Sequence, residues 1–116
     1  MAALSVDGIF EAAVRILLEE EKVINLVFSP GNVMIRFPTT RRLADYLKVP
    51  HYYVLPYFAM MEEMQLVTRA ERVGILTTPT GTKKLLKIIS ERFRDQAILL
   101  MGEKVLSDLE SRAHLS

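Results

Sequence analysis

Two helical segments of this sequence are separated by only three residues, 48–50. The hydroxyl of Thr39 or Thr40 can cap a short helix over residues 41–47. Apolar side chains recur at helical spacing again from about residue 52 to residue 65. Because three residues form no more than a tight turn, the chain is restricted to folds in which these two helices pack directly against each other.

Further elements flank this helix pair. A first helix is predicted over residues 6–21, where apolar side chains recur every three or four positions. Alternating apolar residues predict a strand over residues 33–37, whereas residues 24–28 fit either a strand or a frayed end of the first helix. After the helix pair, residues 66–69 and 73–77 predict a small β-hairpin.

The last part of the chain predicts one long helix. Thr78 followed by Pro79 is a strong helix start, because the hydroxyl caps the first turn and proline suits its first position. The helical pattern continues toward Leu109, and Gly102 is the position at which we expect a bend.

Pro56 conflicts with the helical pattern of the middle segment. In a helix that begins at residue 51, proline lacks the amide that would bond to the carbonyl of Tyr52, at a cost of about 3 kcal/mol. We therefore expect this helix to start late or to kink, with residues 50–55 as an irregular turn.

The composition favours one domain. The chain has 116 residues, half of them apolar, which suffices for a single core without metal or disulfide staples. We expect an α+β fold, mostly α, with residues 1–116 in one domain. Cysteine is absent, which suits a cytoplasmic protein. The sequence has neither a signal-peptide pattern at its N-terminus nor an apolar run long enough to span a bilayer, so we expect no membrane partner.

The sequence offers little for catalysis. Its two histidines, His51 and His114, lie far apart and lack the spacing of a helical zinc site. The adjacent carboxylates Glu62 and Glu63 fit a solvated helix end better than a catalytic pair. We expect no enzymatic activity and no cofactor.

Positive charge is concentrated in the middle of the chain. Residues 36–87 carry nine basic and four acidic side chains, whereas residues 1–35 carry two basic and five acidic ones. Such a distribution is typical of a protein whose central part faces a polyanion.

Residues 42–67 resemble the helix-turn-helix of bacterial and archaeal transcription regulators. Ala44 stands where that family uses a small residue at the helix crossing, and Val49 fills the turn. Val54 and Phe58 take the core side of the second helix, the recognition helix.

Two further segments extend the resemblance to the winged helix-turn-helix. Residues 62–67, Glu-Glu-Met-Gln-Leu-Val, are similar to the run that leads into the wing, which is the β-hairpin after the recognition helix. Residues 76–81, Leu-Thr-Thr-Pro-Thr-Gly, look like the Leu-Thr-Pro-x-Gly segment of MarR-like and PadR-like regulators. The resemblance implies a three-helix core with a small β-wing over residues 33–84, followed by the long C-terminal helix.

The resemblance also implies a regulator that binds duplex operator DNA. Phosphate contacts are expected from basic residues of the helix-turn-helix, major-groove contacts from the start of the recognition helix, and backbone or minor-groove contacts from the wing tip. The residues concerned are Thr39, Arg41, Arg42 and Lys48, then His51, Tyr52 and Tyr53, and finally Arg69 and Arg72. Tyr57 fits the core better than the groove.

Self-association is expected from the ends of the chain. Residues 1–28 and 85–116 carry more apolar side chains than one face of a small domain easily covers, and a symmetric homodimer would bury the surplus. Packing of the same helices within one subunit is the simpler alternative.

The sequence also fits two other functions. The recognition helix lacks the exposed arginine, lysine, glutamine and asparagine that DNA readout commonly uses, so residues 51–57 equally suit a protein partner. A cavity between the apolar helices could also hold a small effector molecule.

Overall fold

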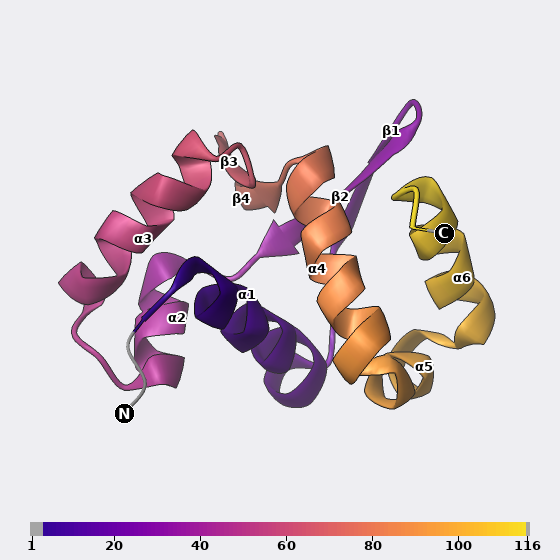
Figure 1. Ribbon diagram of the computed structural model, residues 1–116, viewed down its shortest axis with the longest axis horizontal. Helices are drawn as coiled ribbons and strands as arrows, with labels where there is room; N and C mark the ends of the chain where they lie inside the picture. The colour runs from indigo at the N-terminus through magenta and orange to yellow at the C-terminus, as the bar shows by residue number, and fades with distance from the viewer. Residues whose placement is uncertain (1–3, 116) are drawn as a thin grey trace.

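The computed structural model describes residues 4–115 as a mostly helical α+β fold with an antiparallel sheet (Figure 1). The N-terminal half contains α1 (Val6–Arg15), the π-helical turn η1 (Ile16–Glu21), β1 (Leu26–Ser29), β2 (Asn32–Phe37) and α2 (Thr40–Leu47). The remainder contains α3 (His51–Glu63), β3 (Val67–Ala70), β4 (Gly74–Thr77), α4 (Pro79–Arg92), α5 (Arg94–Met101) and α6 (Glu103–Arg112). None of the described helices is both long and apolar enough to cross a bilayer.

The sheet has the strand order β1-β2-β4-β3. The segment that fitted either a strand or a frayed helix is the strand β1, which pairs with β2 from Leu26↔Ile35 to Ser29↔Asn32. β2 pairs with β4 only through Arg36 and Phe37. The β1–β2 hairpin therefore projects from the body of the molecule, as Figure 1 shows.

α1 is the central helix of the core. It contacts α2, α3 and α4. Ile9, Phe10 and Val14 are fully buried, and the ring of Phe10 lies 5.2 Å from that of Phe37 in β2. The apolar face of α1 is thus covered within a single chain.

Two buried threonines connect the sheet to α4. The hydroxyl of Thr77 accepts a hydrogen bond from the backbone N–H of Ile35 at 2.8 Å. The hydroxyl of Thr82 donates to the carbonyl of Val33, also at 2.8 Å, and the two hydroxyl oxygens lie 2.6 Å apart. Because the proton of Thr82 goes to Val33, Thr77 must donate to Thr82. This threonine relay satisfies the backbone of β2 where that strand parts from β4.

The predicted helix caps are confirmed. Thr39 caps α2 by accepting from the N–H of Arg42 at 3.1 Å, and Thr78 caps α4 by accepting from the N–H of Gly81 at 3.1 Å. Gly81 also permits close packing, because a Cβ at this position would lie 1.8 Å from the carbonyl oxygen of Leu66. The start of α4 is therefore pressed against the residue that precedes β3.

The prediction of one long C-terminal helix is wrong. The chain forms α4, α5 and α6, with one break at Phe93 and another at Gly102, where we expected a bend and where φ is +87°. The breaks turn α6 back so that it packs against α4 and β2 and buries Leu106 and Leu109. A straight helix would have carried both leucines away from the core.

The expected late start of this helix, with residues 50–55 as an irregular turn, is also wrong. α3 runs without interruption from His51 to Glu63 and contains Pro56. Tyr52 and Pro56 both lie on the exposed side of the helix. Water can therefore bond to the Tyr52 carbonyl that lacks an amide partner, which reduces the cost of the proline.

Thr82→Val should destabilise the protein by about 1–3 kcal/mol for each buried group that loses its partner, namely the Val33 carbonyl and the Thr77 hydroxyl. Urea unfolding of both proteins measures this loss. Thr80→Val, at an exposed position of the same helix, is the matched control and should change the free energy of unfolding little. Equal unfolding midpoints for Thr82→Val and the parent protein would refute a structural role for the relay.

Gly81→Ala should destabilise the protein although alanine is the better helix former by about 1 kcal/mol. The added methyl group must displace the Leu66 carbonyl, and overpacking of this kind typically costs about 1–3 kcal/mol. Thermal unfolding, with Thr80→Ala as the control for helix propensity, provides the comparison. A stabilised Gly81→Ala protein would show that the close approach is not needed.

Candidate nucleic-acid interface

The turn between α2 and α3 is built from the backbone. Lys48 ends α2 in the left-handed conformation with φ of 58°, and the N–H of Val49 donates to the carbonyl of Ala44 at 3.1 Å. The hydroxyl of Thr40 and Nε2 of His51 lie 2.7 Å apart and join the starts of the two helices. Because of these bonds, α3 begins immediately after the turn and lies at one end of the molecule (Figure 1).

α3 has an inner face and an outer face. Val54, Phe58 and Met61 are buried, and Tyr57 is partly buried against the same core, as expected for these positions. The outer face is formed by exposed residues and is called the α3 outer face below; its members are Tyr52, Tyr53, Leu55, Pro56, Ala59, Met60 and Glu63. No residue from His51 to Glu63 is arginine, lysine, asparagine or glutamine.

The most exposed part of this face is a tyrosine pair. Tyr52 is 66% exposed and Tyr53 is 50% exposed. Their rings meet edge to face, with centroids 4.9 Å apart. The two phenols therefore form one aromatic unit at the N-terminal end of α3, with hydroxyl groups that can donate or accept hydrogen bonds.

The basic residues near this end differ in availability. Arg42 bonds to Glu20 and also lies 3.7 Å from the carboxylate of Glu21. The hydrogen bond that Arg42 donates to Glu20 raises the pKa of the Arg42 guanidinium above its ordinary value, against a smaller opposing effect of desolvation. Arg41 and Lys48 are exposed, and neither has a carboxylate within 4.0 Å among residues 4–115. These two are the cations that a ligand could reach.

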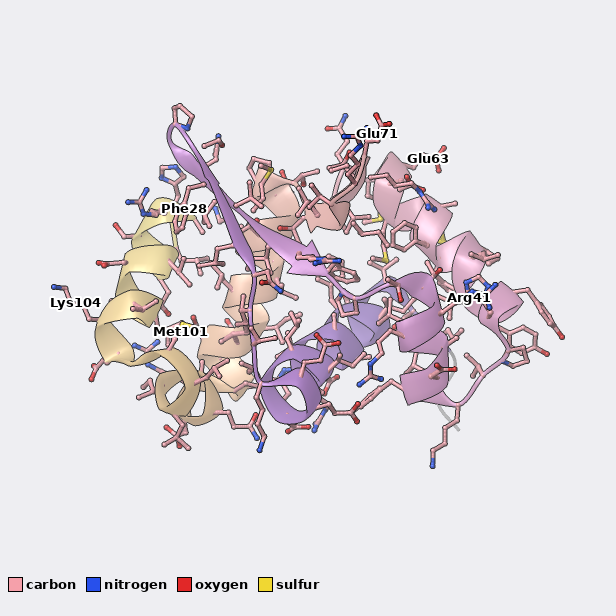
Figure 2. The ribbon with its side chains drawn as sticks, turned by 180° about the vertical axis from the view of Figure 1, so that it is seen from behind. Phe28, Arg41, Glu63, Glu71, Met101 and Lys104 are labelled. Carbon is pink, nitrogen blue, oxygen red and sulfur yellow. The ribbon has the colours of Figure 1, made fainter. Side chains whose placement is uncertain are left out.

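The wing, formed by β3 and β4, shows the same contrast between its two arginines. Arg69 lies 3.3 Å from Glu62 and stacks over the ring of Phe58 at 5.0 Å, so it joins the wing to α3. Arg72 is exposed at the tip, with φ of +67°, and no ion pair in the described part of the chain includes it. Glu71 and Glu63 project from the same corner of the molecule in Figure 2 and lower the positive potential there.

The structure places the predicted residues in two groups along α3. Arg41, Lys48, His51 and the tyrosine pair belong to the N-terminal end of the helix, and the wing follows its C-terminal end. A helix of 13 residues separates the two groups by about 18 Å at 1.5 Å per residue. Thr39 is occupied as the cap of α2.

Sequence reasoning missed Arg36 as a member of this surface. Its exposed guanidinium lies near Gly74, the residue that follows the tip of the wing. Val33, Ile35 and Phe37 of the same strand are buried, so the alternation of β2 already assigned Arg36 to the opposite, solvent side.

A second surface lies at the other end of the molecule. An apolar groove of about 360 Å³ runs between β1 and the C-terminal helices and is lined by Ile24, Leu26, Leu100, Met101, Val105 and Leu109. Nearby in the sequence, Leu99 is 87% exposed. Within residues 4–115, no three histidine, cysteine or acidic side chains converge on a common point as metal ligands would.

Arg69→Ala should lower the free energy of unfolding by about 1 kcal/mol, because it removes an exposed ion pair and a cation–π contact. Arg72→Ala should leave the free energy of unfolding unchanged. Urea unfolding of the two variants side by side tests the assignment of Arg69 to folding and of Arg72 to the free surface. If both variants unfold like the parent protein, Arg69 is as free as Arg72.

A scan of the sequence against protein-family models found no match, and a search of the curated proteins found none either. The candidate interface is therefore described from the structure alone. It consists of an exposed, uncharged stretch of helix with Arg41 and Lys48 at one end and the wing at the other.

Proposed function

We propose that this chain is a winged helix-turn-helix regulator that binds duplex DNA in the cytoplasm. The order α1, β2, α2, turn, α3, wing supports the proposal, since it is the order of that fold. The three-residue turn and the small Ala44 at the helix crossing support it as well. The proposed activity is binding, with no chemical step.

One observation carries this proposal. α3 is an outer helix with one free face, and the free cations Arg41, Lys48 and Arg72 lie next to its two ends. A helix fits the major groove of B-DNA, and cations beside its ends would meet the phosphates that border the groove. Figure 2 shows Arg41 near α3, in the half of the molecule opposite the C-terminal helices.

The residues then divide by role. Arg41, Lys48 and Arg72 bind phosphates, and Arg36 adds a further cation beside Gly74 of the wing. Tyr52 and Tyr53 enter or border the groove. Arg42 and Arg69 hold α2 and the wing in place through their carboxylate partners and contribute less to DNA than their charges suggest.

We further propose that the chain acts as a homodimer through its C-terminal end. The apolar groove and the exposed Leu99 lie at the C-terminal end, whereas the apolar face of α1 is buried within its own subunit. A two-fold dimer of this kind would present two copies of α3 to two half-sites on DNA.

A second candidate is a domain that binds a protein through the same surface. It is favoured by the apolar and aromatic character of the α3 outer face, which is typical of protein interfaces. The acidic side chains Glu63 and Glu71 near the wing also suit a protein partner better than phosphates.

Titration of fluorescent duplexes from a random-sequence library and from genomic fragments, at about 50 mM and about 200 mM salt, tests the main proposal. The double variant Arg41→Ala/Arg72→Ala should bind more weakly. Its slope of log affinity against log salt should be smaller by about 1.8, since each lost phosphate contact removes about 0.9.

Lys104→Ala is the matched control, because this residue lies at the opposite end of the molecule in Figure 2. It should bind like the parent protein. Absence of duplex binding at the lower salt concentration would reject the DNA proposal and favour the protein-binding candidate.

A further inference from the structure

The α3 outer face carries almost no group that can identify three of the four bases. In the major groove, guanine is recognised by arginine or lysine, adenine by asparagine or glutamine, and cytosine by a carboxylate. The first four residue types are absent from α3, and its exposed carboxylate Glu63 is the last residue of the helix. The middle of the face consists of Leu55, Pro56, Ala59 and Met60.

These side chains match one feature of the groove. Thymine presents a C5-methyl group, and apolar side chains recognise it by direct contact. The separations of three and four residues between Tyr52, Leu55, Pro56, Ala59 and Met60 place them along one side of the helix. From Tyr52 to Met60 the helix rises by about 12 Å, the length of three or four base pairs.

The charges at the N-terminal end of this face complement DNA. Residues 46–61 contain no carboxylate, so nothing in this segment repels phosphates. Arg41 and Lys48 flank the N-terminal end of the face without a carboxylate partner in the described chain. An uncharged centre beside free cations is the arrangement that a methyl-lined groove between two phosphate backbones requires.

We propose that α3 recognises a short run of A·T base pairs through the methyl groups of thymine. This inference rests on the proposed DNA-binding function and specifies its target. Leu55, Ala59 and Met60 contact the methyl groups, and the tyrosine pair lies at the edge of the same run. The phosphates supply most of the affinity, and the methyl groups supply the preference for sequence.

Selection from a random duplex library identifies the preferred site, and replacement of each thymine by deoxyuridine then removes only the methyl group. We expect a selected run of three or four A·T pairs. Each deoxyuridine within the run should weaken binding about four-fold, which corresponds to about 0.8 kcal/mol for one buried methyl group. Deoxyuridine outside the run should have no effect.

Leu55→Ser/Ala59→Ser/Met60→Ser should bind thymine and deoxyuridine duplexes equally well, because the protein side of the contact is gone. Lys104→Ser, at an exposed position of α6 far from the α3 outer face in Figure 2, is the control and should keep the preference for thymine. Unchanged unfolding midpoints would show that both variants are folded.

The outcomes separate the two levels of the proposal. Duplex binding that is insensitive to deoxyuridine, or a selected site dominated by G·C pairs, would overturn the inference and leave DNA binding in place. Failure to bind any duplex at low salt would overturn the proposed function itself, and the inference with it.

Discussion

The structure depends on the hydrogen bonds that the backbone of β2 makes outside the two residues that pair with β4. The two strands share only the pairs at Arg36 and Phe37, so the next polar groups of β2 would be buried without partners. Thr77 and Thr82 provide those partners through their hydroxyl groups. Since Thr82 belongs to α4, the same bonds attach that helix to the sheet. Side-chain hydroxyls thus continue the strand pairing and allow β2 to project with β1.

The position of the candidate interface follows from the start of α4. Thr78 donates its hydroxyl to the carbonyl of Gln65, and its N–H donates to Leu66 at 3.0 Å. With Gly81 pressed against Leu66, these bonds fix the point at which α3 gives way to β3. Arg69 adds the contact between wing and helix through Glu62 and Phe58. The wing is therefore held against α3 by contacts at its base and through Arg69, whereas Arg72 at its tip is exposed.

Local features of the fold could be predicted from the sequence, because they depend on neighbouring residues. Thr39 and Thr78 cap helices that begin one residue later, and the alternation of residues 33–37 identifies β2. The break at Phe93 lies inside a continuous helical pattern. It arises from the return of α6 to α4 and β2, a tertiary contact that local periodicity does not contain.

In the candidate site, too, local features could be predicted from the sequence and tertiary contacts could not. The tyrosine pair lies exposed on the first turn of α3, and Arg72 lies exposed at the tip of the predicted hairpin. The engagement of Arg42 by Glu20, 22 residues earlier in the chain, depends on the packing of η1 beside α2. Counting basic residues in the sequence therefore overestimated the positive charge that a ligand would meet, and only the folded chain distinguishes the free cations from the neutralised ones.

Pro56 leaves an unpaired backbone carbonyl on the exposed side of α3. Because proline brings no N–H, the carbonyl of Tyr52 keeps an acceptor that the helix does not use. A ligand that excludes water from this carbonyl must donate a hydrogen bond to it. Without that bond, the binding free energy is less favourable by about 1–3 kcal/mol. The unpaired acceptor is a main-chain carbonyl, so substitution of Tyr52 does not remove it. Replacement of Pro56 by a residue with an N–H does.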